Sequence, residues 1–142
     1  MKRSSTHRPS GFTLIELLLV LVILAVLAGI VIPKFTGRQK QAQETATKTQ
    51  LKNIETAIDA FEIAAGRFPT ESDGGLNAIV TPPADVGDKY KPMFKELPKD
   101  AWGMQFVYKQ PGSHNSDSYD LYSLGADKTE GNDDIGNWSE TK

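Results

Sequence analysis

Residues 12–32, the run FTLIELLLVLVILAVLAGIVI, limit what this chain can fold into more than any other feature. The run contains a single charged residue, Glu16, in 21 positions. At about 1.5 Å per residue, a helix of this length spans roughly 30 Å, which is the thickness of the hydrocarbon core of a bilayer. The sequence therefore predicts one transmembrane helix over 12–32, followed by a soluble part that carries nearly all of the chain's charge.

Two simple interpretations of the N-terminal segment leave parts of it unexplained. A secretory signal peptide would use the small residues of VLAG, at 26–29, with cleavage after Ala28. The apolar run continues through Ile32, however, which is longer than the apolar core of most signal peptides. A plain membrane anchor explains the hydrophobicity, but it explains neither Gly11 nor the carboxylate of Glu16.

The third interpretation rests on the hexapeptide GFTLIE at 11–16, which follows a short basic leader and directly adjoins the apolar run. This arrangement resembles the processing site of the type IV pilin superfamily. The resemblance implies that a prepilin peptidase cleaves between Gly11 and Phe12 on the cytoplasmic side, which removes residues 1–11. It also implies that the same enzyme N-methylates Phe12.

The position of Glu16 then acquires a physical explanation. A charged residue in a membrane helix typically costs about 2.5–3.5 kcal/mol by insertion scales, so it usually has a partner. Cleavage before Phe12 creates an ammonium group at the end of the apolar helix. In subunits stacked with an axial stagger, Glu16 of one subunit can pair with the Phe12 amine of its neighbour, and dry surroundings strengthen the attraction. We predict that Glu16 sets the register of assembly; the alternative is that its carboxylate snorkels to nearby headgroups.

The sequence after Pro33 predicts an amphipathic helix over 33–65 that continues the stalk. Apolar side chains recur there at steps of three and four residues, as one face of a helix requires, and GRFP at 66–69 ends the pattern. These apolar positions are Leu51, Ile54, Ile58, Phe61 and Ala65.

The remaining residues, 66–142, predict a small head of short elements. We expect one short helix near 74–80 and two strands, at 104–110 and 118–125, that form an antiparallel hairpin. The tail at 126–142 is polar and is expected to be irregular.

Four segments of the head, in this order, resemble the major pseudopilins of type II secretion systems: GLNAIV, LPKDAWG, YDLYSLGAD and DIGNW. The resemblance covers almost the whole chain. It implies an α+β, type IV pilin-like fold, in which a long N-terminal helix packs on a small antiparallel β-sheet with a C-terminal loop. The chain departs from the family at Ala101, where the family usually has proline, and the segment between Asp127 and the DI pair is shorter than usual.

The segment LGADKTEGNDDIGNW concentrates carboxylates in eight residues: Asp127, Glu130, Asp133 and Asp134. Carboxylates this close repel each other unless solvent separates them or a cation is shared between them. Calcium takes about six to eight oxygen ligands in flexible geometry, which suits a loop. The resemblance implies one calcium ion, held by the Leu124 carbonyl and by the side chains of Asp127, Asn132, Asp133 and Asp134. Because the chain has no cysteine, such an ion could hold the loop where other proteins use a disulfide; the alternative is a solvated acidic tail.

Neither an enzyme nor a nucleic-acid-binding protein is indicated. The sequence has no Gly-rich phosphate loop, no pair of histidines at metal-ligand spacing and no nucleophile elbow. Its net charge is −2, and its basic residues do not cluster as nucleic-acid binding requires.

The resemblance implies instead a structural subunit that polymerises into a periplasmic pseudopilus and drives the export of folded proteins across the outer membrane. The implied partners are further copies of the chain, minor pseudopilins, the inner-membrane assembly platform, the prepilin peptidase and the outer-membrane secretin. The implied topology is a single pass through the bacterial inner membrane, with the N-terminus in the cytoplasm and the C-terminal domain in the periplasm.

Two other functions remain open at this point. One is a pilin of an extracellular type IV filament, many of which close the C-terminal region with a disulfide that this chain lacks the cysteines to make. The other is a membrane-anchored periplasmic binding module that never polymerises, for which Glu16 would have no use.

Overall fold

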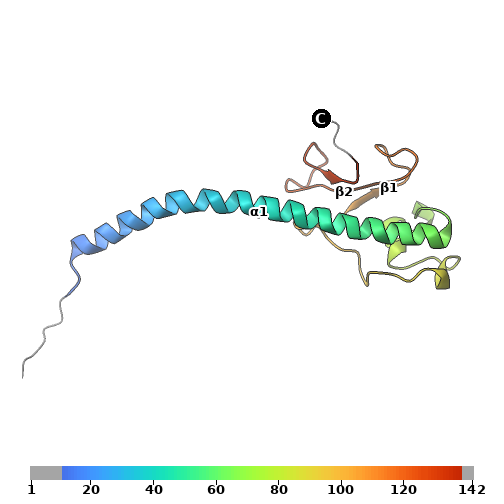
Figure 1. Cartoon of the computed structure of the whole chain (residues 1–142), viewed down its shortest axis with the longest axis horizontal. Helices are drawn as coiled ribbons and strands as arrows, with labels where there is room; N and C mark the ends of the chain where they lie inside the picture. The colour runs from blue at the N-terminus through green and yellow to red at the C-terminus, as the bar shows by residue number, and fades with distance from the viewer. Residues whose placement is uncertain (1–10, 139–142) are drawn as a thin grey trace, which may run out of the picture. The chain divides into compact units, whose positions relative to one another are not determined.

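The computed structural model describes residues 11–138, except for the side chains of residues 30–36 (Figure 1). By its internal packing the chain divides into two units, Met1–Gln39 and Lys40–Lys142. Helix α1 (Leu14–Ala65) contributes residues to both units. Of the predicted leader, residues 1–10 lie outside the described residues, as does the C-terminal end of the tail, 139–142.

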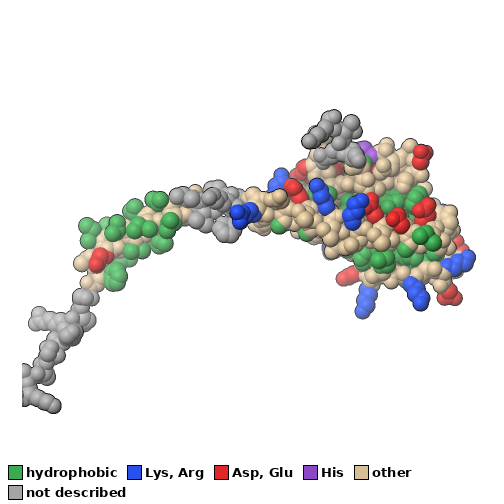
Figure 2. All heavy atoms as spheres, viewed as in Figure 1, with side chains coloured by type: hydrophobic (Ala, Val, Ile, Leu, Met, Phe, Trp, Pro, Cys, Tyr) green, Lys and Arg blue, Asp and Glu red, His purple; other side chains and the backbone are tan. Residues whose placement is uncertain are grey.

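The N-terminal unit exposes a long series of apolar side chains on α1. From Phe12 to Leu27 the exposed fraction of the large ones ranges from 47% at Val20 to 80% at Phe12, and Figure 2 shows them along this part of the helix. Among the described residues, no helix is both long and apolar enough to cross a membrane. The predicted span includes residues 30–32, whose side chains are outside the described set, so a membrane helix over 12–32 stays a prediction.

The C-terminal unit has one hydrophobic core, built on the last turns of α1. The predicted apolar face is confirmed, because Leu51, Ile54, Ile58 and Phe61 are all at most 3% exposed, and Ala65 is half-buried against the same core. These side chains pack against the 3₁₀ helix η2 (Gly75–Ile79) and against the chain that follows it, with Leu76, Ile79, Val86 and Tyr90.

A three-stranded antiparallel sheet completes the core, with the order β1 (Val107–Lys109), β2 (Asp120–Ser123), β3 (Ile135–Gly136). The predicted hairpin is present with shorter strands, and its register pairs Tyr108 with Leu121. All four residues of the central strand are buried. The α+β class with a long helix and a small antiparallel sheet is therefore confirmed.

Strand β3 lies in the tail that the sequence predicted to be irregular. It pairs with β2 through Ser123–Ile135 and Tyr122–Gly136. A strand of two residues is too short to show the alternation of apolar and polar residues on which sequence prediction depends. The prediction of an irregular tail was wrong at this point.

Two further 3₁₀ helices, η1 (Glu71–Asp73) and η3 (Gly87–Lys89), flank η2 in the head. The Arg67 guanidinium holds this region together, since its Nη2 lies 2.8 Å from Asp73 Oδ1 and 3.0 Å from Asp85 Oδ2. The hydrogen bond from Arg67, together with those from Thr70, lowers the pKa of Asp73 to about 2.

Candidate functional site

Thr13 and Glu16 form a capping box at the start of α1. The N–H and the hydroxyl of Thr13 both donate to Glu16 Oε2, at 2.8 Å each, and the N–H of Glu16 donates to Thr13 Oγ1 at 3.3 Å. Such reciprocal bonds satisfy backbone donors that have no partner within the helix, and a carboxylate there also favours the positive end of the helix dipole. The predicted assembly residue therefore has hydrogen-bond partners within its own chain.

Sequence reasoning missed this cap, although the signal was present. Thr-x-x-Glu immediately before an apolar run is the sequence pattern of a capping box. It begins only two residues after the predicted cleavage site. The bond between Gly11 and Phe12 lies outside α1, and both residues are exposed. Pairing of Glu16 with a neighbouring subunit and processing at Gly11 both stay predictions.

The acidic loop, defined here as residues 124–134, does not gather all of its predicted carboxylates in one place. Asp127 is exposed, and it accepts the N–H of Thr129 at 3.0 Å and the hydroxyl of Thr129 at 2.9 Å, which lowers the pKa of Asp127. Glu130 lies 3.0 Å from the Lys109 ammonium, whose hydrogen bond lowers the pKa of Glu130. Two of the four carboxylates therefore have partners of their own.

Asp134 is the exception, because its Oδ1 is buried and has no hydrogen-bond partner among the described residues, 11–138. Its Oδ2 accepts the N–H of Gly131 at 3.3 Å. Burial raises the pKa of Asp134, and the charges of Asp133, Glu130 and Asp127 raise it further. A buried oxygen without a partner is rare in native structures and calls for a specific explanation, such as an ion.

Asp133 lies against Gly125, where the loop returns to its own start. A Cβ atom on Gly125, whose φ is +69°, would lie 3.0 Å from the Asp133 carbonyl oxygen and 3.3 Å from its Oδ2. Leu124 is half-buried and Asn132 is exposed. The loop thus brings Asp133 and Asp134 beside the end of β2.

The donor chemistry of the loop fits calcium, since it consists of carboxylate and carbonyl oxygens. One of these oxygens is buried and has no hydrogen-bond partner within residues 11–138. Within the part of the chain that the structure describes, no three side chains of His, Asp or Glu are grouped so that they could hold a metal ion. A cation here would therefore need backbone carbonyls, such as that of Leu124, to complete its ligands.

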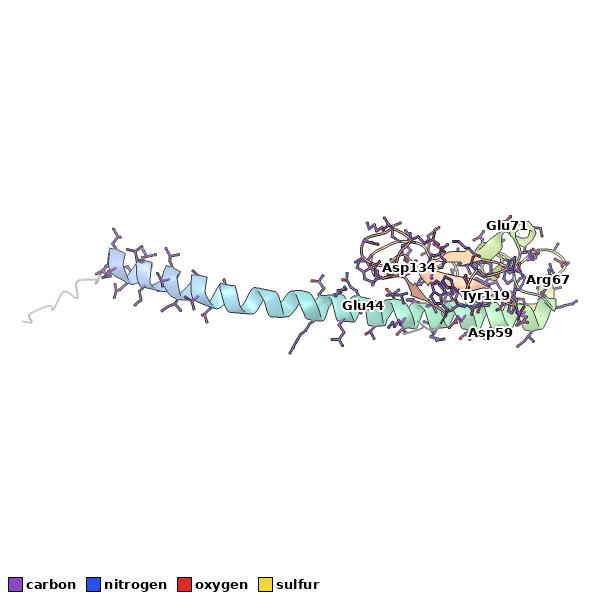
Figure 3. The ribbon with its side chains drawn as sticks, turned by 90° about the horizontal axis from the view of Figure 1, so that it is seen from above. Glu44, Asp59, Arg67, Glu71, Tyr119 and Asp134 are labelled. Carbon is purple, nitrogen blue, oxygen red and sulfur yellow. The ribbon has the colours of Figure 1, made fainter. Side chains whose placement is uncertain are left out.

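A pocket of about 400 Å³ adjoins this loop within the C-terminal unit. The loop side is lined by Asp133, Asp134 and the residues of β3, and the α1 side by Glu44 and Lys48. Figure 3 labels Glu44 on the helix and Asp134 on the loop. Sequence reasoning had no signal for Glu44, because it lies about ninety residues away from the loop in the chain.

The segment DIGNW, at 134–138, packs against β2 and against the residues that precede it. The Asn137 side chain accepts the N–H of Leu121 at 3.0 Å and donates to the Tyr119 carbonyl at 3.1 Å. The Trp138 ring lies over Gly136, where a Cβ would be 2.5 Å from the ring, and stacks on His114 with ring centres 4.0 Å apart. Trp138 is thus a packing residue, and Gly136 is required because any side chain would clash with the ring.

Comparison with known proteins identifies the family. The family model described as "Type II secretion system (T2SS), protein G" matches residues 34–138, and the model described as "Prokaryotic N-terminal methylation motif" matches residues 6–32. The chain belongs to the type II secretion system protein G family. Together the two models cover residues 6–138 except for Pro33, which includes the predicted cleavage site.

Relatives in this family match the chain over nearly its full length. The type II secretion system core protein G of Vibrio cholerae is 37% identical over 140 residues, which covers 94% of this chain and 94% of the relative. That of Pseudomonas aeruginosa is 41% identical over 143 residues, covering 93% and 96%.

A solved structure supports the fold in the same way. The crystal structure of the major pseudopilin from the type 2 secretion system of enterohaemorrhagic Escherichia coli matches with a TM-score of 0.59 at 28% identity, covering 77% of this chain and 97% of that one. The predicted resemblance to the major pseudopilins is confirmed, and with it a structural role in type II secretion.

Proposed function

We propose that this protein G family member polymerises into the periplasmic pseudopilus of a type II secretion system and that the growing filament drives folded proteins across the outer membrane. Membership of the family carries the proposal. The processing motif at its N-terminus and the exposed apolar surface of α1 support it, since such a surface needs lipid or neighbouring subunits to cover it.

Before assembly the subunit is anchored in the inner membrane by residues 12–32, with the head in the periplasm. A prepilin peptidase cleaves after Gly11 and methylates the amine of Phe12. The same apolar helix then packs against those of neighbouring subunits in the filament. The further partners in this proposal are minor pseudopilins, the inner-membrane assembly platform and the outer-membrane secretin.

Glu16 has two separable roles in this account. Within one subunit it completes the capping box with Thr13, which needs a hydrogen-bond acceptor but not a charge. Between subunits it supplies the charge that pairs with the Phe12 amine of the neighbour. The two roles can be tested apart because glutamine serves as well as glutamate in a capping box.

We also propose that calcium binds to the acidic loop through the Leu124 carbonyl and the side chains of Asp133 and Asp134. Asp127 and Asn132 are the further predicted ligands, and Asp127 would have to leave its hydrogen bonds with Thr129 to reach the ion. When bound, the ion would supply positive charge that balances these carboxylates. The buried, unpartnered Oδ1 of Asp134 supports this. The ion would be structural, and we propose no catalytic role for any residue of the chain.

Processing and assembly can be measured on one sample. The chain is expressed together with the other genes of its secretion system, filaments are sheared from the cells, and the intact mass of the recovered chain is determined. The expected mass is that of residues 12–142 with one methyl group. A Gly11→Ala variant serves as the control and should remain uncleaved in the membrane fraction. A wild-type chain that begins at Gly29, or that never appears in sheared material, contradicts the proposal.

A further inference from the structure

Asp100 lies at the centre of a buried hydrogen-bond network outside the acidic loop. Its side chain closes the turn at 100–104, because Oδ1 accepts the N–H of Trp102 at 3.0 Å and that of Met104 at 2.8 Å. Its other oxygen, Oδ2, accepts the hydroxyl of Ser123 at 2.6 Å. Asp100 is only 6% exposed, so this carboxylate depends on these donors rather than on water.

Ser123 connects Asp100 to the acidic loop through two hydrogen bonds. It is fully buried at the end of β2, and its Oγ accepts the N–H of Gly125 at 3.1 Å while its hydroxyl donates to Asp100. Gly125 in turn lies close to the Asp133 backbone. A continuous series of contacts therefore leads from the turn at 100–104 to Asp133, the residue before Asp134.

The turn itself is tied to α1 by a hydrogen bond that depends on Ala101. The N–H of Ala101 donates to Thr47 Oγ1 at 3.2 Å, and Thr47 is fully buried. A proline, which has no N–H, could not make this bond. The alanine by which the chain departs from the usual family pattern thus gives the turn a direct link to the helix.

We propose that Asp100 is a positioning residue for the acidic loop. Without contacting a cation, it fixes Ser123 and Gly125, and through them the places of the Leu124 carbonyl, Asp133 and Asp134. The claim about cation affinity rests on the calcium site proposed above, whereas the claim about loop position does not. Hydrogen-bond partners that orient metal ligands typically change metal affinity by about 10–100-fold when they are removed.

The primary variant is Ser123→Ala, which breaks the series of contacts at its middle and leaves the Asp100 turn in place. Asp100→Asn tests the carboxylate itself. Asp73→Asn is the matched control, because Asp73 is also a well-buried carboxylate, with its side chain 7% exposed, but it bonds to Arg67 and Thr70 rather than to the loop.

Two quantities are measured on the full chain in detergent micelles: the calcium dissociation constant, and the hydrogen exchange of amides 124–134 with a chelator present. For Ser123→Ala we expect calcium to bind about tenfold more weakly and exchange to rise in the loop but not in α1. The control should melt at a lower temperature and leave both quantities unchanged.

Loop exchange in the variants tests the positioning role of Asp100, and calcium affinity tests its link to the proposed ion. Unchanged loop exchange in both Ser123→Ala and Asp100→Asn overturns it, as does an equal rise in the Asp73→Asn control. If the wild type binds no calcium, the calcium site is wrong, but faster exchange confined to 124–134 in Ser123→Ala still supports the positioning role. Calcium binding that is unaffected by Ser123→Ala while loop exchange rises contradicts the link between loop position and affinity.

Discussion

Two carboxylates of the chain differ in their hydrogen-bond partners: Glu16 at the start of α1 and Asp134 in the acidic loop. Glu16 accepts two hydrogen bonds from Thr13, three residues earlier in the chain. Asp134 has one buried oxygen for which the described part of the chain offers no hydrogen-bond partner. The Glu16 carboxylate therefore has hydrogen-bond donors within its own chain, whereas Oδ1 of Asp134 has none among the residues that the structure describes.

This difference suggests different external partners for the two sites: a neighbouring subunit for Glu16 and an ion for Asp134. At the N-terminus we propose that a neighbouring subunit supplies a positive charge, the Phe12 amine, which no hydrogen bond from Thr13 replaces. In the acidic loop we propose that a calcium ion satisfies the buried Oδ1 of Asp134.

The largest effect is expected from Glu16→Gln. Glutamine keeps the capping box but removes the charge, so the Phe12 ammonium of the next subunit is left unpaired in a dry site. We expect normal processing and nearly complete loss of sheared filaments. Glu16→Ala, which removes both roles, is the comparison. Filament yields for Glu16→Gln equal to those of the wild type would show that capping, and not charge, is what Glu16 contributes.

Calcium should have the next largest effect. At about a hundredfold excess over Kd, binding stabilises the head by roughly 2.7 kcal/mol, which corresponds to about 10–20 °C in melting temperature at about 4–8 °C per kcal/mol. Melting the full chain in detergent, with calcium and with chelator, measures the shift. Asp134→Ala should remove it. A wild-type shift under about 2 °C would leave the buried oxygen of Asp134 without a ligand and the loop as a solvated tail.

Acid should protonate the carboxylate of Asp73 and so weaken its hydrogen bonds with Arg67 and Thr70, which lowers the stability of the fold. Its pKa of about 2 in the folded chain is below the ordinary value of 3.8, so its contribution is present above pH 4 and is lost as the pH falls towards 2. The melting temperatures of the wild type and of Asp73→Asn should differ at pH 6 and converge near pH 2. A constant difference across this range would contradict the role of the charge.

Loss of the helix cap should have the smallest effect. Replacing an N-cap threonine by alanine typically costs about 1 kcal/mol, which raises the equilibrium constant for local opening of the helix end roughly fivefold. Hydrogen exchange in the first turn of α1 should rise by about that factor in Thr13→Ala and stay near the wild-type rate in Thr13→Ser. Equal exchange in all three chains would mean that the capping box does not hold the carboxylate of Glu16.

The features that were predictable from the sequence are those whose partners are close in the chain. The apolar face from Leu51 to Phe61 repeats every three or four residues, and the two hairpin strands follow one another in the chain, joined by residues 110–119. The capping box was equally local and could have been read from Thr13 and Glu16.

What the sequence did not show depends on residues that are distant in the chain. Ser123 meets Asp100, and Ala101 meets Thr47, only because the fold brings them together. The grouping of four carboxylates suggested one shared site, yet Glu130 is paired with Lys109 and Asp127 with its own turn. Carboxylates that are close in the sequence therefore need not lie together in the structure, and the sequence did not show which of them bond to other residues.

The most direct test of the central distinction is the distance from the Glu16 carboxylate to the Phe12 nitrogen of the neighbouring subunit, in a cryo-electron-microscopy map of the assembled filament. The account predicts a hydrogen-bonding distance of about 2.7–3.2 Å between these two groups. A separation beyond about 6 Å, with no other cation at the carboxylate and Glu16 bonded only to Thr13 as in the single chain, would contradict it.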